Sequence, residues 1–286
     1  MLHPSTIQLL RFHFSFFLLP VYLFALSQLP NQVHWWKALA AFVILHLLVY
    51  PSSNGYNSYM DRDDTPIGGL KNPMQPTRQL FVVSVVMDVV AILLSFYIHP
   101  FFALGILFYI MASRAYSYRR IRLKQYPLTG FLTVFIFQGA AVFAITYLFC
   151  STVRHSMPWL QCGIASLLIG TSYPLTQIYQ HQQDKADGVI TISYLLGKKG
   201  TFVFSFILFG LATFLLFVLL NGQGALPLFY LFLACMLPVV LFFTYWYYKV
   251  WKTASAADFK NSLRMNVIST LCMLVYFSTS IILQYT

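Results

Sequence analysis

Glutamate is absent from this chain, and only seven of its 286 residues are aspartate. Charged residues of both signs make up 9% of the sequence, whereas soluble domains carry about 25%. An ordinary charged surface cannot be built from so few acids, which excludes a typical water-soluble protein. Because hydrophobic residues make up 59% of the chain, a membrane protein is the class that fits.

Cysteine is also scarce, and the four cysteines stand singly in or beside apolar stretches. They show no paired spacing typical of zinc or redox sites, so we interpret them as packing residues. The net charge of +11 comes from basic residues that flank hydrophobic segments. Such residues set membrane orientation or contact anionic lipid, so the lipid bilayer, and not nucleic acid, is the expected partner. Whether the protein has protein partners is unknown from the sequence.

Nine apolar stretches are long enough to cross a bilayer, which takes about 20 residues. They are residues 6–28, 36–55, 79–99, 101–117, 128–149, 158–178, 201–220, 225–248 and 263–284. Irregular backbone cannot face lipid, so the predicted fold class is all-α. We expect a polytopic transmembrane bundle of about nine helices around a central cavity, in a single domain over residues 1–286. The first stretch lacks a small-residue cleavage site and is predicted to be retained as a span.

Lysine and arginine are distributed unevenly between the two sets of connections. Those after the second, fourth, sixth and eighth stretches hold most of them, and the opposite set holds only Lys37 and Arg154. The positive-inside rule therefore places the N-terminus and the basic connections in the cytoplasm, and the C-terminal residues 284–286 outside. The short loops suit a bacterial cytoplasmic (inner) membrane.

Five of the seven aspartates fall into two of these basic connections. In the first, Asn57, Asp61 and Asp64 are spaced i, i+4, i+7 and share one face if the second helix continues this far. In the second, Gln180 and Asp184 are one helical turn apart on one face, and Asp187 continues that face. Oxygen ligands of this kind suit Mg²⁺, which usually shares them with substrate phosphates. The alternative is a solvated polar helix end in each case.

Basic and acidic residues elsewhere also allow two interpretations. Five cations between Arg114 and Lys124 either mark topology or contact phosphate; Arg122 and Lys124 point the same way if the segment is extended. Arg11 lies inside the first span, where it is functional or snorkels to the membrane surface. Asp88 lies in the middle of the third span, where a hydrogen bond between helices is the expected explanation.

Three motifs, taken together, resemble those of the UbiA family of membrane prenyltransferases. The stretch from Asn57 to Asp64 resembles the family's Asn-Asp-x-x-Asp-x-x-x-Asp motif and includes its common Asp-Arg-Asp core. Tyr116-Ser117 followed by residues 121–124 resembles Tyr-Ser-x-x-x-x-Arg-Leu-Lys. The stretch from Gln180 to Gly188 resembles Asp-x-x-x-Asp-x-x-x-Gly, with glutamine in place of the first aspartate. The order of the motifs and the nine helices fit the same family.

The resemblance implies a Mg²⁺-dependent transfer of a prenyl group from an isoprenoid diphosphate to a lipophilic acceptor, often an aromatic ring or quinone precursor. The catalytic residues that it implies are Asn57, Asp61, Asp64 and Asp184. The implied metal ligands are Asn57, Asp61, Asp64, Gln180, Asp184 and Asp187. The implied diphosphate contacts are Arg11, Lys71, Tyr116, Arg122 and Lys124.

Departures from the motifs leave two other hypotheses open. Gln180 brings no charge, and Ser58 stands where the first motif has its second residue, aspartate. A relative with impaired catalysis would bind a prenyl lipid without turning it over. An unrelated transporter is the third hypothesis, although a transporter should hold its ionisable residues near the middle of the membrane.

Overall fold

The structure is a computed structural model that describes residues 2–284 and is entirely helical apart from its connections. Tyr285 and Thr286, predicted to lie outside the cell, fall beyond the described residues. The α-helices and short 3₁₀ or π segments (η) are α1 (Pro4–Leu9), η1 (Phe12–Leu18), α2 (Leu19–Ser27), α3 (Trp35–Phe42), η2 (Val43–Val49), α4 (Tyr50–Asp61), α5 (Arg78–Ile98), α6 (Pro100–Ser117), η3 (Leu123–Gln125), α7 (Pro127–Val134), η4 (Phe135–Ala141), α8 (Val142–Phe149), α9 (Trp159–Gln177), α10 (His181–Ala186), α11 (Ile192–Gly222), α12 (Leu226–Lys252), η5 (Ala254–Ala256) and α13 (Phe259–Ile282).

Eight helical stretches among the described residues are long and apolar enough to cross a membrane. Together with α9 they match the nine predicted spans in order, and the third and fourth meet at Pro100 as expected. The helix α9 is not among the eight because its second half is rich in polar residues, including Ser172, Thr176 and Gln177. These residues line an internal cavity, which explains why a buried helix of the bundle is less apolar than its neighbours.

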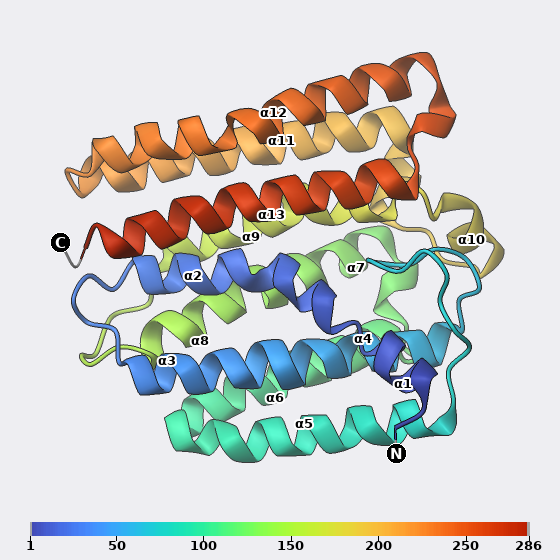
Figure 1. Ribbon diagram of the computed structural model, residues 1–286, viewed down its shortest axis with the longest axis horizontal. Helices are drawn as coiled ribbons and strands as arrows, with labels where there is room; N and C mark the ends of the chain where they lie inside the picture. The colour runs from blue at the N-terminus through green and yellow to red at the C-terminus, as the bar shows by residue number, and fades with distance from the viewer. Residues whose placement is uncertain (1, 285–286) are drawn as a thin grey trace.

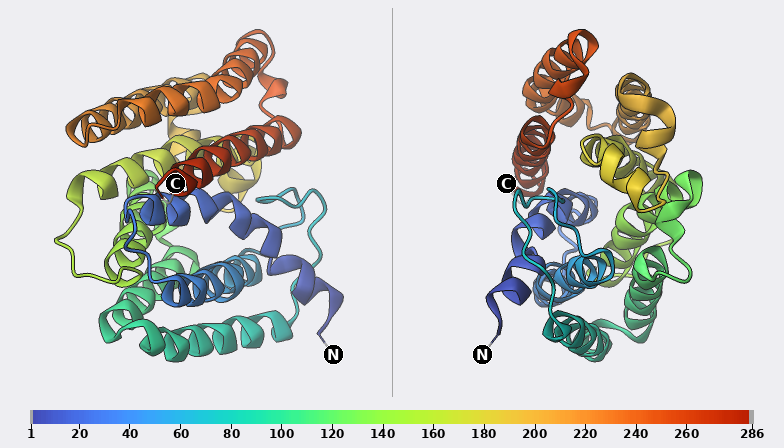
Figure 2. Two further views of the ribbon diagram at one scale, coloured as in Figure 1. Left: turned by 60° about the vertical axis from the view of Figure 1, so that its left-hand side comes forward. Right: turned by 90° about the vertical axis from the view of Figure 1, so that its right-hand side faces the viewer.

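The helices of the bundle lie side by side, and the two acidic connections emerge at the same end of it (Figure 1). The connection after α4 and the short helix α10 both lie at that end, while the C-terminal end of the described chain lies at the other. Viewed from that end, the helices surround a central region that these connections partly cover (Figure 2). Both acidic clusters therefore occupy one end of the bundle, as their place in two connections of the same basic set predicts.

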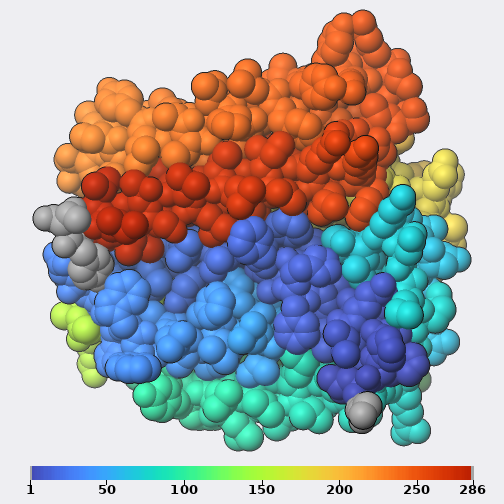
Figure 3. Space-filling view, in the orientation of Figure 1, coloured from blue at the N-terminus to red at the C-terminus, as the bar shows by residue number. Residues whose placement is uncertain are grey.

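The N-terminal segment fastens the connection after α4 to the bundle. The side-chain amide of Gln8 donates to the carbonyl of Asn72 at 3.2 Å and accepts from the amide of Met74 at 2.8 Å. In the space-filling view the residues of this connection pack directly against the N-terminal segment (Figure 3). These bonds hold the loop that carries part of the first acidic cluster.

The opposite end of the interior is closed by aromatic rings. Phe24 of α2 packs against Phe143 of α8 and Phe277 of α13, with ring centroids 4.7 Å and 5.1 Å away. All three side chains are fully buried. None of these three rings lines the cavity that the acidic connections border.

Candidate active site

The helix α4 delivers the first pair of site residues. Asn57 and Asp61 lie one turn apart, and the Asn57 amide donates to Asp61 Oδ2 at 2.9 Å and to Ser117 Oγ of α6 at 3.0 Å. The helix ends at Asp61 because Arg62 adopts left-handed backbone angles, with φ 56° and ψ 43°. Asn57 and Asp61 are therefore held together at the end of α4, with α6 as their support.

The turn at Arg62 changes which aspartate faces the interior. The helix does not continue to Asp64, so the prediction that Asp64 shares a face with Asn57 and Asp61 is wrong. Asp64 is exposed and does not line the cavity, whereas Asp63 is partly buried and does. Asp63 takes the position that the sequence analysis gave to Asp64.

The second acidic cluster forms a separate short helix. Gln180 directly precedes α10, and both Gln180 and Asp184 line the cavity. The Gln180 amide donates to the carbonyl of Pro66 at 3.2 Å, and the Gln183 amide donates to Asp63 Oδ1 at 2.6 Å. The two acidic connections are thus bonded to each other across the end of the bundle, as their predicted convergence requires.

Asp187 does not continue the cavity face of α10. It follows the last residue of the helix, and its carboxylate forms an ion pair with Arg122 instead of lining the cavity. The expectation that Asp187 continues the face of Gln180 and Asp184 is therefore wrong. Its observed role is to hold the basic connection after α6.

The basic connection supplies one cation to the cavity and one behind it. Arg122 has left-handed angles and Lys124 lies in a 3₁₀ turn, so the segment is not extended. Lys124 lines the cavity and pairs with Asp61. Arg122 is buried, pairs with Asp187 and lies 3.5 Å from Asp61 Oδ1. Asp61 is thus held between two cations.

The remaining predicted contacts separate into two groups. Tyr116 and Arg11 line the cavity, but Lys71 is exposed and does not. Arg11 is 5% exposed, so it does not snorkel, and its guanidinium donates to the carbonyls of Gly68 at 3.4 Å and Asn54 at 3.1 Å. Arg11 therefore joins the N-terminal segment to α4 and to the loop that follows it.

Asp88 forms the bond between helices that its position predicted. Its carboxylate pairs with Arg114 of α6 and accepts from Ser52 of α4, and the Arg114 guanidinium lies over the Tyr56 ring at 3.9 Å. This cluster lies away from the cavity, on the far side of α4. It joins α4, α5 and α6 directly beneath the turn that carries Asn57 and Asp61.

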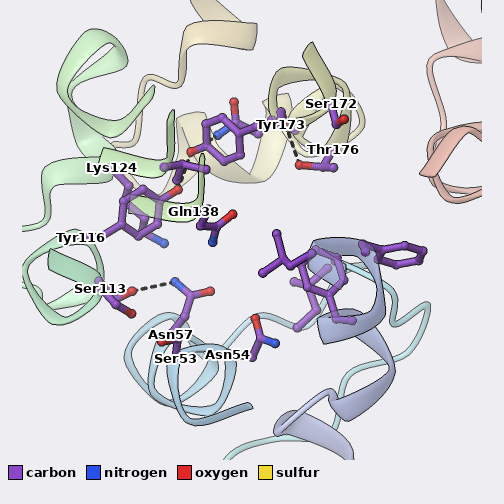
Figure 4. A pocket seen from close by; sticks show the side chains of 18 of the residues that line it. Ser53, Asn54, Asn57, Ser113, Tyr116, Lys124, Gln138, Ser172, Tyr173 and Thr176 are labelled. Carbon is purple, nitrogen blue, oxygen red and sulfur yellow. Dashed lines mark hydrogen bonds between the residues drawn. The ribbon is translucent and has the colours of Figure 1, made fainter. Parts of the chain in front are cut away.

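A cavity of about 240 Å³ connects these residues to the interior of the bundle. Figure 4 shows side chains from several helices converging on it, among them Asn54, Asn57, Tyr116, Gln138 and Tyr173. The hydroxyls of Tyr116 and Tyr173 are 2.6 Å apart, and the Gln177 amide donates to Tyr173 at 2.8 Å. Aspartates and Lys124 lie at the end near the connections, and neutral polar and aromatic side chains line the deeper part.

Burial weakens the acidity of the two loop carboxylates that face the cavity. Burial, together with the nearby carboxylate of Asp61, raises the pKa of Asp63 to about 6. Burial raises the pKa of Asp184 to about 7, although Lys124 opposes this shift, and its Oδ2 atom is buried without a hydrogen-bond partner. A bound cation would relieve both effects, because it stabilises the ionised carboxylates and supplies the missing partner.

The carboxylates fit a metal ion that is shared with a substrate. Among the described residues, no three histidine, cysteine or acidic side chains gather closely enough to hold a metal by themselves. Mg²⁺ typically takes one or two carboxylates and completes its octahedron with water and substrate phosphates. Asp61, Asp63 and Asp184, with the carbonyl oxygens of Asn57 and Gln180, are of the right chemistry for such a shared site.

Several cavity residues were not found from the sequence. Asp63 was passed over for Asp64, and Tyr173, Gln177 and Gln138 were not singled out. The cavity-facing side of α9 could have been predicted from the sequence. Ser172, Thr176 and Gln180 recur every four residues in an otherwise apolar stretch, which is the pattern of a helix side that faces a polar interior.

Comparison with known proteins gives consistent matches over nearly the whole chain. Residues 17–268 match the UbiA prenyltransferase family. Among solved structures, a UbiA homolog from Archaeoglobus fulgidus bound to DMAPP and Mg²⁺ aligns with a TM-score of 0.69 at 18% identity, covering 97% of this chain and 99% of that one. A UbiA homolog from Aeropyrum pernix K1 aligns with a TM-score of 0.68 at 16% identity, covering 96% and 98%.

A digeranylgeranylglyceryl phosphate synthase also aligns, with a TM-score of 0.62 at 18% identity, covering 97% of this chain and 98% of that one. No match was found among curated proteins. At these identities the solved structures establish a shared fold.

Proposed function

The chain belongs to the UbiA prenyltransferase family, and on this premise we propose that it transfers a prenyl group from an isoprenoid diphosphate to a lipophilic aromatic acceptor, with Mg²⁺ as cofactor. The observation that carries the proposal is the cavity itself. Carboxylates from two distant connections and the Lys124 ammonium gather at its mouth, while its deeper part is neutral and lies inside a membrane bundle. A substrate with a charged diphosphate and an apolar chain matches this division.

Asp61, Asp63 and Asp184 are the residues that we expect to hold Mg²⁺, with the Asn57 and Gln180 carbonyls as neutral ligands. Bound Mg²⁺ supplies positive charge that stabilises the diphosphate as it leaves. The Gln180 amide already donates to Pro66, which leaves its carbonyl oxygen available for a ligand. The family member from Archaeoglobus fulgidus solved with GPP and Mg²⁺ supports this assignment of cofactor and substrate class.

The protein's own cations act on the leaving group and on the carboxylates. Lys124 faces the cavity from the basic connection and is placed to meet the diphosphate oxygens. Arg122 stays behind it, where its pairs with Asp61 and Asp187 fix the connection in place. We propose that Arg122 positions Lys124 and Asp61, in place of the direct diphosphate contact implied by the motif.

Loss of the diphosphate leaves an allylic carbocation that must be protected from water. The rings of Tyr116, Tyr173 and Phe137 line the cavity below the carboxylates. Their faces are electron-rich and can stabilise a cation, and the same rings offer a stacking surface to a flat acceptor. These rings are the support for an aromatic acceptor over a purely aliphatic one.

We place the acidic connections on the cytoplasmic side of a cytoplasmic membrane. The support is the excess of lysine and arginine in the connections at that end of the bundle. An isoprenoid diphosphate is membrane-impermeant because of its charge, so a mouth on this side would give it access from the cytoplasm.

The proposal is tested by prenyl transfer in detergent-solubilised protein. Radiolabelled isoprenoid diphosphates of several lengths are incubated with phenolic acceptors and Mg²⁺, and lipid-soluble product is counted. Product formation is expected to stop when EDTA removes the metal and to return when Mg²⁺ is added back. Diphosphate binding without product, in a protein that gains turnover with Gln180→Asp, would point to the catalytically impaired relative instead.

The raised pKa values of the carboxylates at the mouth predict a pH-dependent metal affinity. A carboxylate must lose its proton to bind Mg²⁺. Because the pKa is about 7 for Asp184 and about 6 for Asp63, protons compete with the metal below these values. We expect the Mg²⁺ concentration for half-maximal diphosphate binding to rise about tenfold as the pH falls from about 8 to about 6. A metal requirement that does not change over this range would contradict the assignment of these two carboxylates.

A further inference from the structure

The fifth span contains an irregularity that its apolar sequence gives no reason to expect. Between α7 and α8 the chain forms the seven-residue π segment η4. Short π segments within α-helices are rare and are found frequently at functional sites. This one is fixed by α9: a Cβ on Gly139 would lie 2.4 Å from Ser166 Cα, so the two helices touch backbone to backbone. The amide of Ala140, within this segment, donates to Ser166 Oγ at 3.0 Å.

The consequence of this π segment is the placement of Gln138. Its side chain lines the cavity, and Figure 4 shows its amide directed toward the open centre, with Tyr116 and Tyr173 on one side and Asn54 across from it. A carboxamide has two donors and a carbonyl oxygen with two lone pairs. The hydroxyl of Tyr109 accounts for one bond. The remaining donor and acceptor groups of the Gln138 carboxamide face the cavity. Inside a membrane bundle, an amide without hydrogen-bond partners is energetically unfavourable.

The surroundings of Gln138 are polar but uncharged. Ser53, Ser113 and Asn266 reach the same cavity from α4, α6 and α13, and none of these side chains has an assigned partner among the described residues. Apolar residues of η1, including Phe14 and Phe17, supply another part of the wall. The interior therefore offers hydrogen bonds and an apolar surface, which together suit an acceptor head group and a prenyl chain.

The cations of the cavity wall lie elsewhere and are already engaged. Among the described lining residues these are Lys124, paired with Asp61, and Arg11, whose guanidinium donates to two carbonyls while its buried Nε atom has no hydrogen-bond partner. Gln138 lies eleven residues beyond Pro127, the start of α7, which places it about 16 Å deeper along the span. A carboxylate beside Gln138 would be buried without a counter-charge, and this costs far more than burying a hydrogen-bonded neutral group.

We infer that Gln138, displayed by the π segment, recognises the acceptor through an uncharged hydroxyl or carbonyl, and that the acceptor carries no carboxylate at that position. This inference rests on the proposed prenyltransferase function and adds the chemical class of its second substrate. The acceptor is a neutral phenol or quinol whose hydroxyl bonds to Gln138 while its ring lies near Tyr116 and Tyr173.

The test measures acceptor binding separately from diphosphate binding. The full-length protein is loaded with Mg²⁺ and an unreactive prenyl thiolodiphosphate, and dissociation constants are measured for two pairs of phenols. The pairs are hydroquinone against 2,5-dihydroxybenzoate and 1,4-dihydroxynaphthalene against its 2-carboxylate, kept anaerobic. We expect the neutral member of each pair to bind at least about tenfold more tightly, because the two members share the hydroxyls and only the carboxylate would be buried without a partner.

Three variants assign the preference to Gln138. Gln138→Leu should weaken binding of the neutral phenols about tenfold while leaving thiolodiphosphate affinity unchanged. Gln138→Arg should reverse the preference, because it gives the carboxylate a partner. Gln161→Leu, the same change on the first turns of α9 outside the cavity, is the matched control and should alter neither constant.

Equal binding of the two members, tighter binding of the carboxylates to the wild-type protein, no binding of either member or unweakened binding of the neutral phenols in Gln138→Leu would each overturn the inference. Failure of the proposed function would look different, since the thiolodiphosphate itself would then fail to bind in the presence of Mg²⁺.

Discussion

Replacement of Asp61 by asparagine is expected to lower the rate of prenyl transfer by about a hundredfold to a thousandfold. The Asp61 carboxylate faces the cavity, its side chain is 4% exposed, and it pairs with both Lys124 and Arg122. Asparagine keeps the shape but removes the charge that we assign to Mg²⁺ binding. It also leaves Lys124 without its carboxylate partner, while Arg122 keeps its pair with Asp187. The measurement is kcat/KM for the prenyl diphosphate at saturating Mg²⁺, with the thermal midpoint of unfolding recorded alongside.

Asp64 provides the matched control for this experiment. It stands three residues further along the same connection, is exposed and does not line the cavity. Asp64→Asn should keep activity within about twofold of wild type, as exposed substitutions usually do for stability. Asp63→Asn should resemble Asp61→Asn. A loss in Asp64→Asn as large as that in Asp63→Asn would restore the assignment that the sequence motif suggested.

The contrast between Asp63 and Asp64 shows where the motif stops being informative. Spacing predicts a shared face only while the chain stays helical, and the left-handed conformation of Arg62 ends the helix. The direction of the chain beyond that point depends on bonds to distant residues, such as the one from Gln183 to Asp63. No local pattern encodes a contact across 120 positions. Which aspartate faces inward is therefore a tertiary property.

Features that rest on composition and alternation were predicted correctly. Apolar length gave the order of the helices, and the distribution of lysine and arginine placed both acidic clusters at one end of the bundle. These predictions work because membrane insertion acts on whole segments and averages over individual residues. The π segment that displays Gln138 could not be predicted in this way, because one extra residue in a turn does not change the apolarity of the span.

The buried pair of Asp88 and Arg114 should make a large contribution to stability without taking part in the chemistry. Asp88→Asn removes the charge that faces the Arg114 guanidinium, one of whose nitrogens already lacks a partner. Breaking a buried pair on one side typically lowers the free energy of unfolding by about 3–5 kcal/mol. We expect this loss in unfolding measurements in detergent. Catalysis should fall too, since Ser52 and Tyr56, which contact the pair, belong to the helix that carries Asp61.

Replacing both partners shows whether the stability lost in Asp88→Asn comes from the uncompensated charge of Arg114 or from a general loss of packing. In the double variant Asp88→Asn, Arg114→Gln no buried charge remains, and two amides can bond to each other and to Ser52. The double variant should therefore recover at least half of the stability lost in Asp88→Asn, a coupling that a double-mutant cycle measures directly. Additive losses would show that the two side chains act independently. The helix α4 carries Asn57 and Asp61 one turn above this pair, so recovered stability should be accompanied by recovered Mg²⁺ affinity. A double variant that regains stability but not Mg²⁺ affinity would show that the pair supports the fold but does not align the site.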